Sequence, residues 1–280
     1  MPFRWSINPY RGCAMGCVYC FARITHWYLD EDGVRDWTRR IYVKVNAPEV
    51  LRRELARPAW KRELVALGTA TDPYQPLEGR YRITRGVLQA LGEFRTPVSI
   101  VTKGSMIVRD LDVLQELARG PGCSVSFSVT TMDAALARQI EPDPPPPLQR
   151  LRAMQRLVDA GVPAGVLVAP ILPGLTDAEE SLEAVVRAAT DHGARFLGGM
   201  LLHLGDVTRD AYFEFLEHKY PALIPEYQAV YRGKYAARDR QRRVQEVVAA
   251  LKRRYLIPQG TGVRTERRNP SAEQLSLLAP

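Results

Sequence analysis

The chain has 280 residues, of which 46% are apolar and 25% are charged, so it is long enough to bury one large hydrophobic core. It has no apolar stretch of the length that a membrane-spanning helix needs, and its start lacks the charged-then-apolar pattern of a signal peptide. These features argue against a membrane partner and predict a soluble, cytoplasmic protein.

The net charge of +8 is concentrated toward the carboxyl end. Residues 209–268 contain 14 Lys and Arg against 7 Asp and Glu. A basic block of this kind is typical of proteins that contact nucleic acid. The solvent-facing side of a helix has the same composition. Nucleic acid is therefore a candidate partner, and a solvated helix face is an equal alternative.

Short apolar runs alternate with amphipathic helical patterns through most of the chain. The predicted strands cover residues 4–8, 63–69, 97–102, 124–130, 164–169 and 195–201. The predicted helices between them cover residues 48–57, 84–94, 110–119, 148–160 and 177–191. This alternation predicts parallel βα units. Six such units favour an α/β fold, a partial (β/α)6 TIM-like barrel, over a closed eight-fold barrel.

Several of these helices have a recognisable start. Pro48 suits a first helical turn, and Asp110 precedes an amphipathic run. Thr176 and Glu179 have the spacing of a capping box. The proline-rich residues 142–147 cannot be helical and predict a stiff, extended loop.

Three further helical patterns follow at residues 209–219, 222–231 and 238–254. We interpret the chain as a barrel of residues 1–205 with a basic helical extension of residues 206–260. Residues 261–280 are polar and lack periodicity, so they are expected to form a flexible tail.

Cysteine is crowded into one loop after the first predicted strand. Three of the four cysteines, Cys13, Cys17 and Cys20, have the spacing C-x3-C-x2-C. They are too close for a disulfide framework, and the pattern is typical of metal ligation. Because the loop contains Gly12 and Gly16, three thiolates can surround one iron–sulfur cluster from one side. Such a cluster normally takes four cysteines, so one iron would keep an open position for chemistry.

Two other interpretations of this loop stay open. A zinc site would need a fourth ligand, for which His26 is the nearest candidate. The three thiols could also be buried without any metal. Cys123 begins a buried-looking strand, so we expect it to be a small core residue.

At this loop the sequence resembles the radical S-adenosylmethionine (SAM) superfamily, whose signature is three cysteines spaced this way with an aromatic residue before the last, here Tyr19. Further segments resemble the spore photoproduct lyase-like branch, a group often labelled DNA repair photolyase. These segments are residues 8–13, 16–23, 68–76, 101–104, 126–131 and 169–174. They fall at the carboxyl ends of predicted strands, where the ligands of a barrel gather.

The resemblance implies that the three loop cysteines hold a [4Fe-4S] cluster and that SAM chelates its open iron. It implies that an electron from a reductant such as flavodoxin or ferredoxin splits SAM into methionine and a 5′-deoxyadenosyl radical, which takes hydrogen from a substrate. It also implies a set of contacts with SAM. These are Tyr19 against the adenine, Thr71 and Asp72 at the methionine part, Lys103 at the carboxylate, and Ser128 with Thr130 at the ribose.

The sequence departs from the lesion-repairing spore photoproduct lyases that it resembles at two positions. Those enzymes carry a hydrogen-donating cysteine near the second strand end and a tyrosine after the third cluster cysteine, where this chain has Ala70 and Phe21. Neither residue can return a hydrogen atom to a product radical. The departure argues against the same repair reaction.

The sequence therefore predicts a radical SAM enzyme with an unassigned substrate, for which nucleic acid or a modified nucleotide is the leading candidate. Modification of a peptide or protein is an alternative, although the chain lacks further cysteine groups for auxiliary clusters. A non-catalytic, metal-containing nucleic-acid-binding module is a third, but it would not need SAM contacts. Tyr10, Tyr74 and His203 are candidate residues on the substrate side, and each could equally be a packed or exposed side chain.

Overall fold

Six strands form one parallel sheet in the computed structural model, which describes residues 3–30, 32–33 and 35–258. The strands follow one another in the sheet in chain order: β1 (Trp5–Ile7), β4 (Val65–Leu67), β5 (Val98–Thr102), β6 (Cys123–Ser128), β7 (Ala164–Ile171) and β8 (Leu197–Leu201). Within the described residues, β1 and β8 do not pair with each other, so the sheet is not closed. The predicted partial barrel is confirmed.

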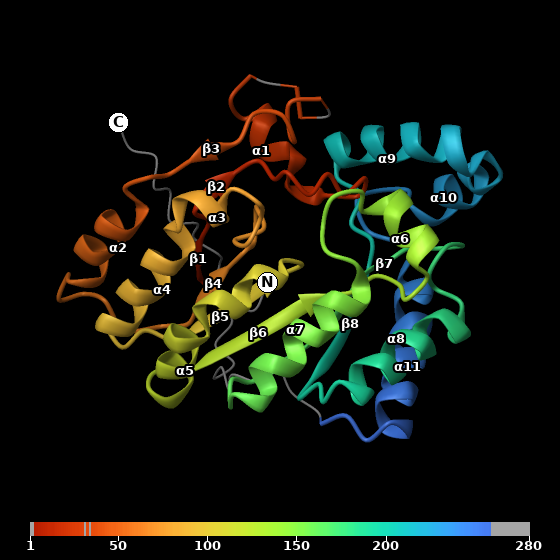
Figure 1. Ribbon diagram of the computed structural model, residues 1–280. Coiled ribbons are helices and arrows are strands. Elements are labelled where there is room, and N and C mark those ends of the chain that lie inside the picture. Colours follow the sequence, from red (N-terminus) through yellow and green to blue (C-terminus); the bar gives the residue numbers. More distant parts are fainter. Residues whose placement is uncertain (1–2, 31, 34, 259–280) are drawn as a thin grey trace.

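An outer layer of helices covers the sheet (Figure 1). It consists of α2 (Ala47–Leu55), α4 (Ile83–Glu93), α5 (Leu111–Arg119), α7 (Pro147–Asp159), α8 (Glu179–Asp191) and α11 (Arg238–Arg254). Each helix buries one apolar stripe, as α5 does with Val113, Leu114 and Leu117. This packing forms the main hydrophobic core between the sheet and the helices.

Shorter elements connect the strands to this layer. Strand β2 (Tyr10–Arg11) pairs antiparallel with β3 (Tyr42–Val43). The short helices are η1 (Phe21–Arg23), α1 (Ile24–Trp27), α3 (Glu78–Tyr81), η2 (Ser105–Asp110), α6 (Ala134–Ile140), η3 (Pro221–Leu223) and α10 (Ile224–Val230). They are too short for a periodic pattern to predict most of them.

The helical extension packs against the cysteine loop. Helix α9 (Asp206–Lys219) contacts η1, and Thr208 donates a hydrogen bond to the Cys20 carbonyl at 3.2 Å. A second hydrophobic core joins Cys13, Cys17 and Tyr19 to side chains of α9 and α10. The division near residue 205 therefore stays a prediction, and the expected tail, residues 261–280, lies outside the described residues.

The predicted capping box at Thr176 is wrong, and Asp110 precedes its helix as predicted but makes no capping hydrogen bond. The buried Thr176 hydroxyl accepts a hydrogen bond from the Leu172 N–H at 2.8 Å, and α8 begins only at Glu179. Asp110 stands at the start of α5 without capping it, because its carboxylate accepts from Arg85 and Arg109 instead. Among the described residues, every helix is too short or too polar to span a lipid bilayer.

Candidate active site around the cysteine loop

The cysteine loop, residues 12–20, lies between β2 and η1 and turns at two glycines. Gly12 and Gly16 have φ values of +83° and +65°, which favour glycine. A Cβ atom on Gly12 would lie 2.8 Å from the Arg40 carbonyl oxygen, and one on Gly16 would lie 3.1 Å from Cγ of Pro142. The loop therefore packs closely against two distant segments of the chain.

The three thiols of this loop are shielded from water. Cys13 and Cys17 are buried, and Cys20 is half-buried. Burial raises the pKa of all three, that of Cys17 to about 12, and the nearby Cys20 contributes to the increase for Cys13 and Cys17. The three sulfur atoms therefore lie in one loop that is shielded from water. A bound cationic metal group would offset the cost of three thiolates there.

His26, the candidate fourth ligand of a zinc site, is engaged in other contacts. In the part of the chain that the structure describes, no three His, Cys, Asp or Glu side chains are placed to bind one metal ion. Nε2 of the buried His26 lies 2.8 Å from the Arg40 carbonyl oxygen, and its ring packs against Trp37, so it braces the loop. Cys123 is buried at the opposite end of β6 from Ser128, as expected for a core residue.

Residues after β4 hold the cysteine loop in place. The Thr71 hydroxyl donates to the Gly12 carbonyl at 2.6 Å. Gln75 donates to the same carbonyl at 3.2 Å and accepts from the Ala14 N–H at 3.0 Å. Sequence reasoning missed Gln75. The contact of Thr71 with SAM stays a prediction, while its hydrogen bond to the loop is a feature of the fold.

Asp72 joins the turn after β4 to the turn after β5. Its carboxylate accepts hydrogen bonds from the Thr102 hydroxyl and the Lys103 N–H, both at 2.6 Å, and from the Tyr74 N–H at 2.8 Å. Burial raises the pKa of Asp72, and these hydrogen bonds oppose the rise. Asp72 therefore fixes the backbone from which Lys103 extends.

Lys103 is a shielded cation that forms an ion pair but no hydrogen bond with its nearest anion. Its side chain is 14% exposed, and Nζ lies 5.5 Å from the centre of the Tyr19 ring. The nearest carboxylate oxygen, on Glu141, is 3.9 Å away, which is too far for a hydrogen bond. Burial acts to lower the pKa of Lys103, but Cys17 and Glu141 together raise it above its ordinary value. The ammonium group therefore stays charged.

Glu141 is at the centre of a buried network that sequence reasoning missed. One carboxylate oxygen accepts from the Tyr19 hydroxyl and, at 3.0 Å, from the Thr130 hydroxyl. The other accepts from Arg150, which is 1% exposed. Burial alone would raise the pKa of Glu141, but Arg150 and Lys103 hold it below its usual range. The carboxylate is therefore charged although it is buried.

The sequence contained one signal for this network. Arg150 lies on the buried stripe of α7 together with Leu151, Met154 and Leu157. A charged side chain on such a stripe needs a buried partner.

The two residues expected at the ribose lie where β6 ends beside β7. Oγ of Ser128 donates to the Ala169 carbonyl at 2.7 Å. The Thr130 hydroxyl lies between Glu141, Tyr19 and the same carbonyl. The structure thus brings Tyr19, Lys103 and Thr130 together around Glu141, and their contacts with SAM stay predictions.

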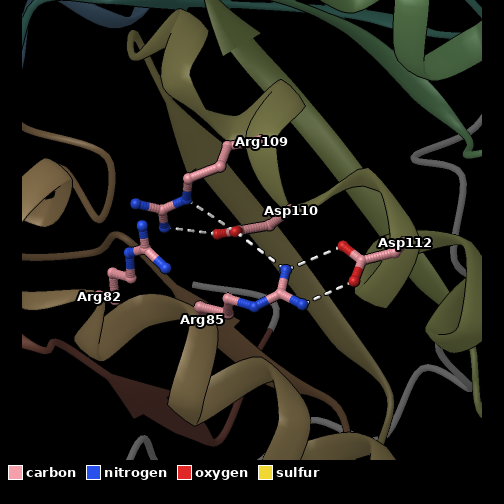
Figure 2. A pocket seen from close by; sticks show the side chains of 5 residues that line it. All are labelled: Arg82, Arg85, Arg109, Asp110 and Asp112. Atoms are coloured by element: carbon pink, nitrogen blue, oxygen red, sulfur yellow. Dashed lines mark hydrogen bonds and ion pairs between the residues drawn. The ribbon is translucent and has the colours of Figure 1, made fainter.

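For two of the three candidate substrate-side residues, the structure shows the packed alternative. Tyr10 and Tyr74 are fully buried, and the Tyr10 hydroxyl donates to the buried Glu78. Glu78 belongs to a second charged network with Arg109, part of which is drawn in Figure 2. His203 lies just after β8 with its ring 4.9 Å from that of Tyr235, and its role stays a prediction.

A sequence profile described as the radical SAM superfamily matches residues 7–206. An uncharacterized protein of Mycobacterium tuberculosis is 41% identical over 258 residues, which cover 92% of this chain and 76% of that protein. An uncharacterized protein of Methanocaldococcus jannaschii is 27% identical over 177 residues, which cover 63% of each chain.

Solved structures show the same fold at low sequence identity. A mutant spore photoproduct lyase with bound AdoMet and dinucleoside spore photoproduct aligns with a TM-score of 0.67 at 15% identity, over 89% of this chain and 73% of that one. Streptococcus suis SuiB bound to the precursor peptide SuiA aligns with a TM-score of 0.60 at 15% identity, over 92% of this chain and 48% of that one.

Proposed function

Because the chain belongs to the radical SAM superfamily, whose enzymes use a [4Fe-4S] cluster and SAM, we propose that Cys13, Cys17 and Cys20 hold the cluster and that SAM binds beside Lys103. The observation that carries this proposal is the pairing of three shielded thiols with a charged lysine whose Nζ makes no hydrogen bond within the described residues. A shielded ammonium group of this kind gains most from a charge-assisted hydrogen bond to an anionic ligand.

The residues around Lys103 suit the other parts of SAM. The Tyr19 ring, held through its hydroxyl by Glu141, offers an aromatic face for the adenine. The Ser128 hydroxyl donates its own proton to Ala169, so its oxygen remains an acceptor for a ribose hydroxyl. When bound, the reduced cluster supplies the electron that cleaves SAM to methionine and a 5′-deoxyadenosyl radical. A flavodoxin or ferredoxin is proposed as the reductant.

For the substrate, we propose nucleic acid or a modified nucleotide. The exposed cations on and before α11 support this. Arg232, Lys234, Arg238, Arg242 and Arg243 are exposed and have no ion-pair partner among the described residues. Such cations can contact phosphates and release counterions.

Other cations of the same block are engaged within the protein. Arg240 pairs with Asp177 at 2.7 Å and with Glu226 at 3.0 Å. Arg254 pairs with Glu183 at 2.8 Å. The proposed contact surface is therefore limited to the unpaired cations.

The reaction is proposed to differ from lesion repair. Phe21, directly after Cys20, is 45% exposed and carries no transferable hydrogen on a weak bond, and Ala70 at the end of β4 has no thiol. A hydrogen atom returned to a product radical would have to come from another group.

The first test is anaerobic reconstitution with iron and sulfide, reduction, addition of SAM and chromatography for 5′-deoxyadenosine. We expect the product with the wild-type chain and none with a variant lacking all three loop cysteines. Equal product from both would remove the cysteine loop from the reaction.

The nucleic-acid part has its own test, which is the affinity for a labelled oligonucleotide at several salt concentrations. We expect binding that weakens steeply with salt and that is reduced when Arg238, Arg242 and Arg243 are all changed to Ala. Replacement of Arg53, Arg57 and Lys61 by Ala is the control, because it removes the same charge near α2, away from α11 (Figure 1). No binding at low salt would refute this part, and a new modification on a co-expressed peptide would favour the peptide alternative.

A further inference from the structure

The segment between α6 and α7, residues 141–146, lies directly against the cysteine loop. The Val18 N–H donates to the Ile140 carbonyl at 3.1 Å, at the point where this segment begins. On the other side of the contact, a Cβ atom on Gly16 would lie only 3.1 Å from Cγ of Pro142, so the two backbones approach closely. The stiff proline-rich segment therefore supports the Gly16–Tyr19 part of the loop and places the Glu141 carboxylate beside it.

Arg150 holds this segment through hydrogen bonds from its guanidinium group. Its Nε donates to the Pro145 carbonyl at 2.6 Å, and Nη1 donates to the Ser128 carbonyl at 2.9 Å. Its Nη2 donates to Glu141. One buried guanidinium group thus ties the proline-rich segment, the end of β6 and the carboxylate into one unit, with the planar geometry that arginine provides.

This arrangement separates the tasks of two cations near Glu141. Arg150 bonds directly to the carboxylate and neutralises it. Lys103, at 3.9 Å, is not needed as a hydrogen-bond donor to that carboxylate. Lys103 can therefore turn toward an anionic ligand without leaving a buried, unpaired carboxylate behind.

The same carboxylate fixes the aromatic ring. The Tyr19 and Thr130 hydroxyls both donate to one oxygen of Glu141. With the hydroxyl held at one end and the backbone held by the loop at the other, the ring has one orientation. A shorter or uncharged side chain at residue 141 could not hold Tyr19, Thr130 and Arg150 at once.

We propose that Glu141, neutralised by Arg150, is a positioning residue for SAM. Glu141 orients the Tyr19 ring and keeps Lys103 beside the place for the SAM carboxylate without a hydrogen bond to Lys103. This rests on the proposed roles of Tyr19 and Lys103 in SAM binding. It assigns to the α6–α7 segment a part in cofactor recognition that the cysteine motif does not contain.

The test compares the dissociation constant of SAM for the full, cluster-loaded chain with Glu141→Gln, Glu141→Asp, Tyr19→Phe and the double variant Tyr19→Phe/Glu141→Gln. We expect Glu141→Gln to weaken SAM binding by about tenfold, because one of the two carboxylate oxygens becomes an amide N–H donor. That donor faces either Arg150 or the hydroxyls of Tyr19 and Thr130, all of which need an acceptor. Glu141→Asp should weaken binding similarly, since it keeps the charge but withdraws the carboxylate. The double variant should bind no more weakly than Glu141→Gln alone, because both changes break one contact.

Iron and sulfide content, and the electron paramagnetic resonance signal of the reduced cluster with and without SAM, are measured on each variant. Cluster content should match the wild type, while the SAM-induced change in the signal should need higher SAM concentrations. Unchanged or tighter SAM binding in Glu141→Gln would overturn the inference, and so would wild-type affinity in Glu141→Asp. A loss of iron that parallels the loss of SAM affinity in these variants would also overturn it. A wild-type chain that binds no SAM would instead refute the proposed function.

Discussion

Two buried charge networks of the protein use the same residue types and differ in one respect. Both contain a carboxylate that accepts from a tyrosine and an arginine: Glu78 with Tyr10 and Arg109, and Glu141 with Tyr19 and Arg150. In the first network, Arg109 is bonded to Glu78 and Asp110, and Arg85 is bonded to Asp110. In the second, Lys103 is charged but unbonded and lies next to the thiols.

We call the network of Glu78 and Arg109 the closed network and that of Glu141 and Lys103 the open network. Figure 2 shows part of the closed network, where Arg85 and Arg109 direct their guanidinium groups at Asp110. Asp112 binds Arg85 through both oxygens at 2.8 and 2.6 Å. A hollow of about 390 Å³ borders these side chains, whose bonds are made within the network, and the exposed Arg82, which no hydrogen bond or ion pair joins to them. Buried charge and a neighbouring hollow are therefore found in a structural network too. A charged group that makes no hydrogen bond and lies beside a reactive group distinguishes the functional network.

The largest expected effect belongs to the thiols of the open network. Cys17→Ala should abolish cluster assembly and SAM cleavage while the fold persists, because the cysteine loop lies outside the sheet. Iron and sulfide content, 5′-deoxyadenosine formation and circular dichroism measure this. Cys123→Ala serves as the control and should keep its cluster. Cleavage by Cys17→Ala would exclude the assigned ligand set.

The closed network should affect stability and not cofactor binding. Asp110→Ala removes the buried carboxylate that Arg85 and Arg109 share, leaving Glu78 as the buried partner of Arg109 alone, and should lower the free energy of unfolding by about 3 kcal/mol, measured by urea denaturation. The SAM affinity of the folded, reconstituted variant should equal that of the wild type. Weaker SAM binding at unchanged stability would reverse the assignment of the two networks.

The open network should behave in the opposite way. Lys103→Met keeps the apolar stem but removes the ammonium group, so SAM binding should weaken by about 1–3 kcal/mol, the range for a lost charge-assisted hydrogen bond. The free energy of unfolding of the cluster-free chain should change less than in Asp110→Ala, because Nζ loses only the 3.9 Å ion pair with Glu141 and no hydrogen bond. Unchanged SAM affinity, measured by equilibrium dialysis, would remove Lys103 from the site.

An exposed pair provides the smallest expected effect. Arg52 binds Glu93 through both carboxylate oxygens at 2.7 and 2.9 Å, and this bond lowers the pKa of Glu93. Arg52→Ala should therefore cost less than about 1 kcal/mol of unfolding free energy at neutral pH. Because the pKa of Glu93 is lower in the folded than in the unfolded chain, the ion pair stabilises the fold at pH values above the unfolded pKa. The difference in unfolding free energy between the wild type and Arg52→Ala should therefore vanish as the pH falls through the folded pKa of Glu93. A difference that persists in acid would show that packing, and not the ion pair, is responsible.

The sequence predicted the scaffold better than the site. All six strands are found, because short apolar runs between helical patterns are local signals. The cysteine loop was equally visible, since its spacing is local. Glu141, Arg150 and Gln75 were missed because their partners are far away in the chain and depend on how the loops meet. The prediction of Thr176 as a helix cap was wrong for a related reason, because its hydroxyl accepts a hydrogen bond from the Leu172 N–H in the preceding turn.

Within the proposed function, the unbonded Lys103 and the three shielded thiols also affect how long a newly made chain survives. Without cofactors, this region keeps groups whose favourable partners are missing, so the cluster and SAM act as ligands of the folded state. A ligand at a hundredfold excess over its dissociation constant adds about 2.7 kcal/mol to the free energy of unfolding. Cells short of iron would then degrade more of this protein, because proteolysis follows the unfolded fraction, and its abundance would rise and fall with the supply of its own cofactors.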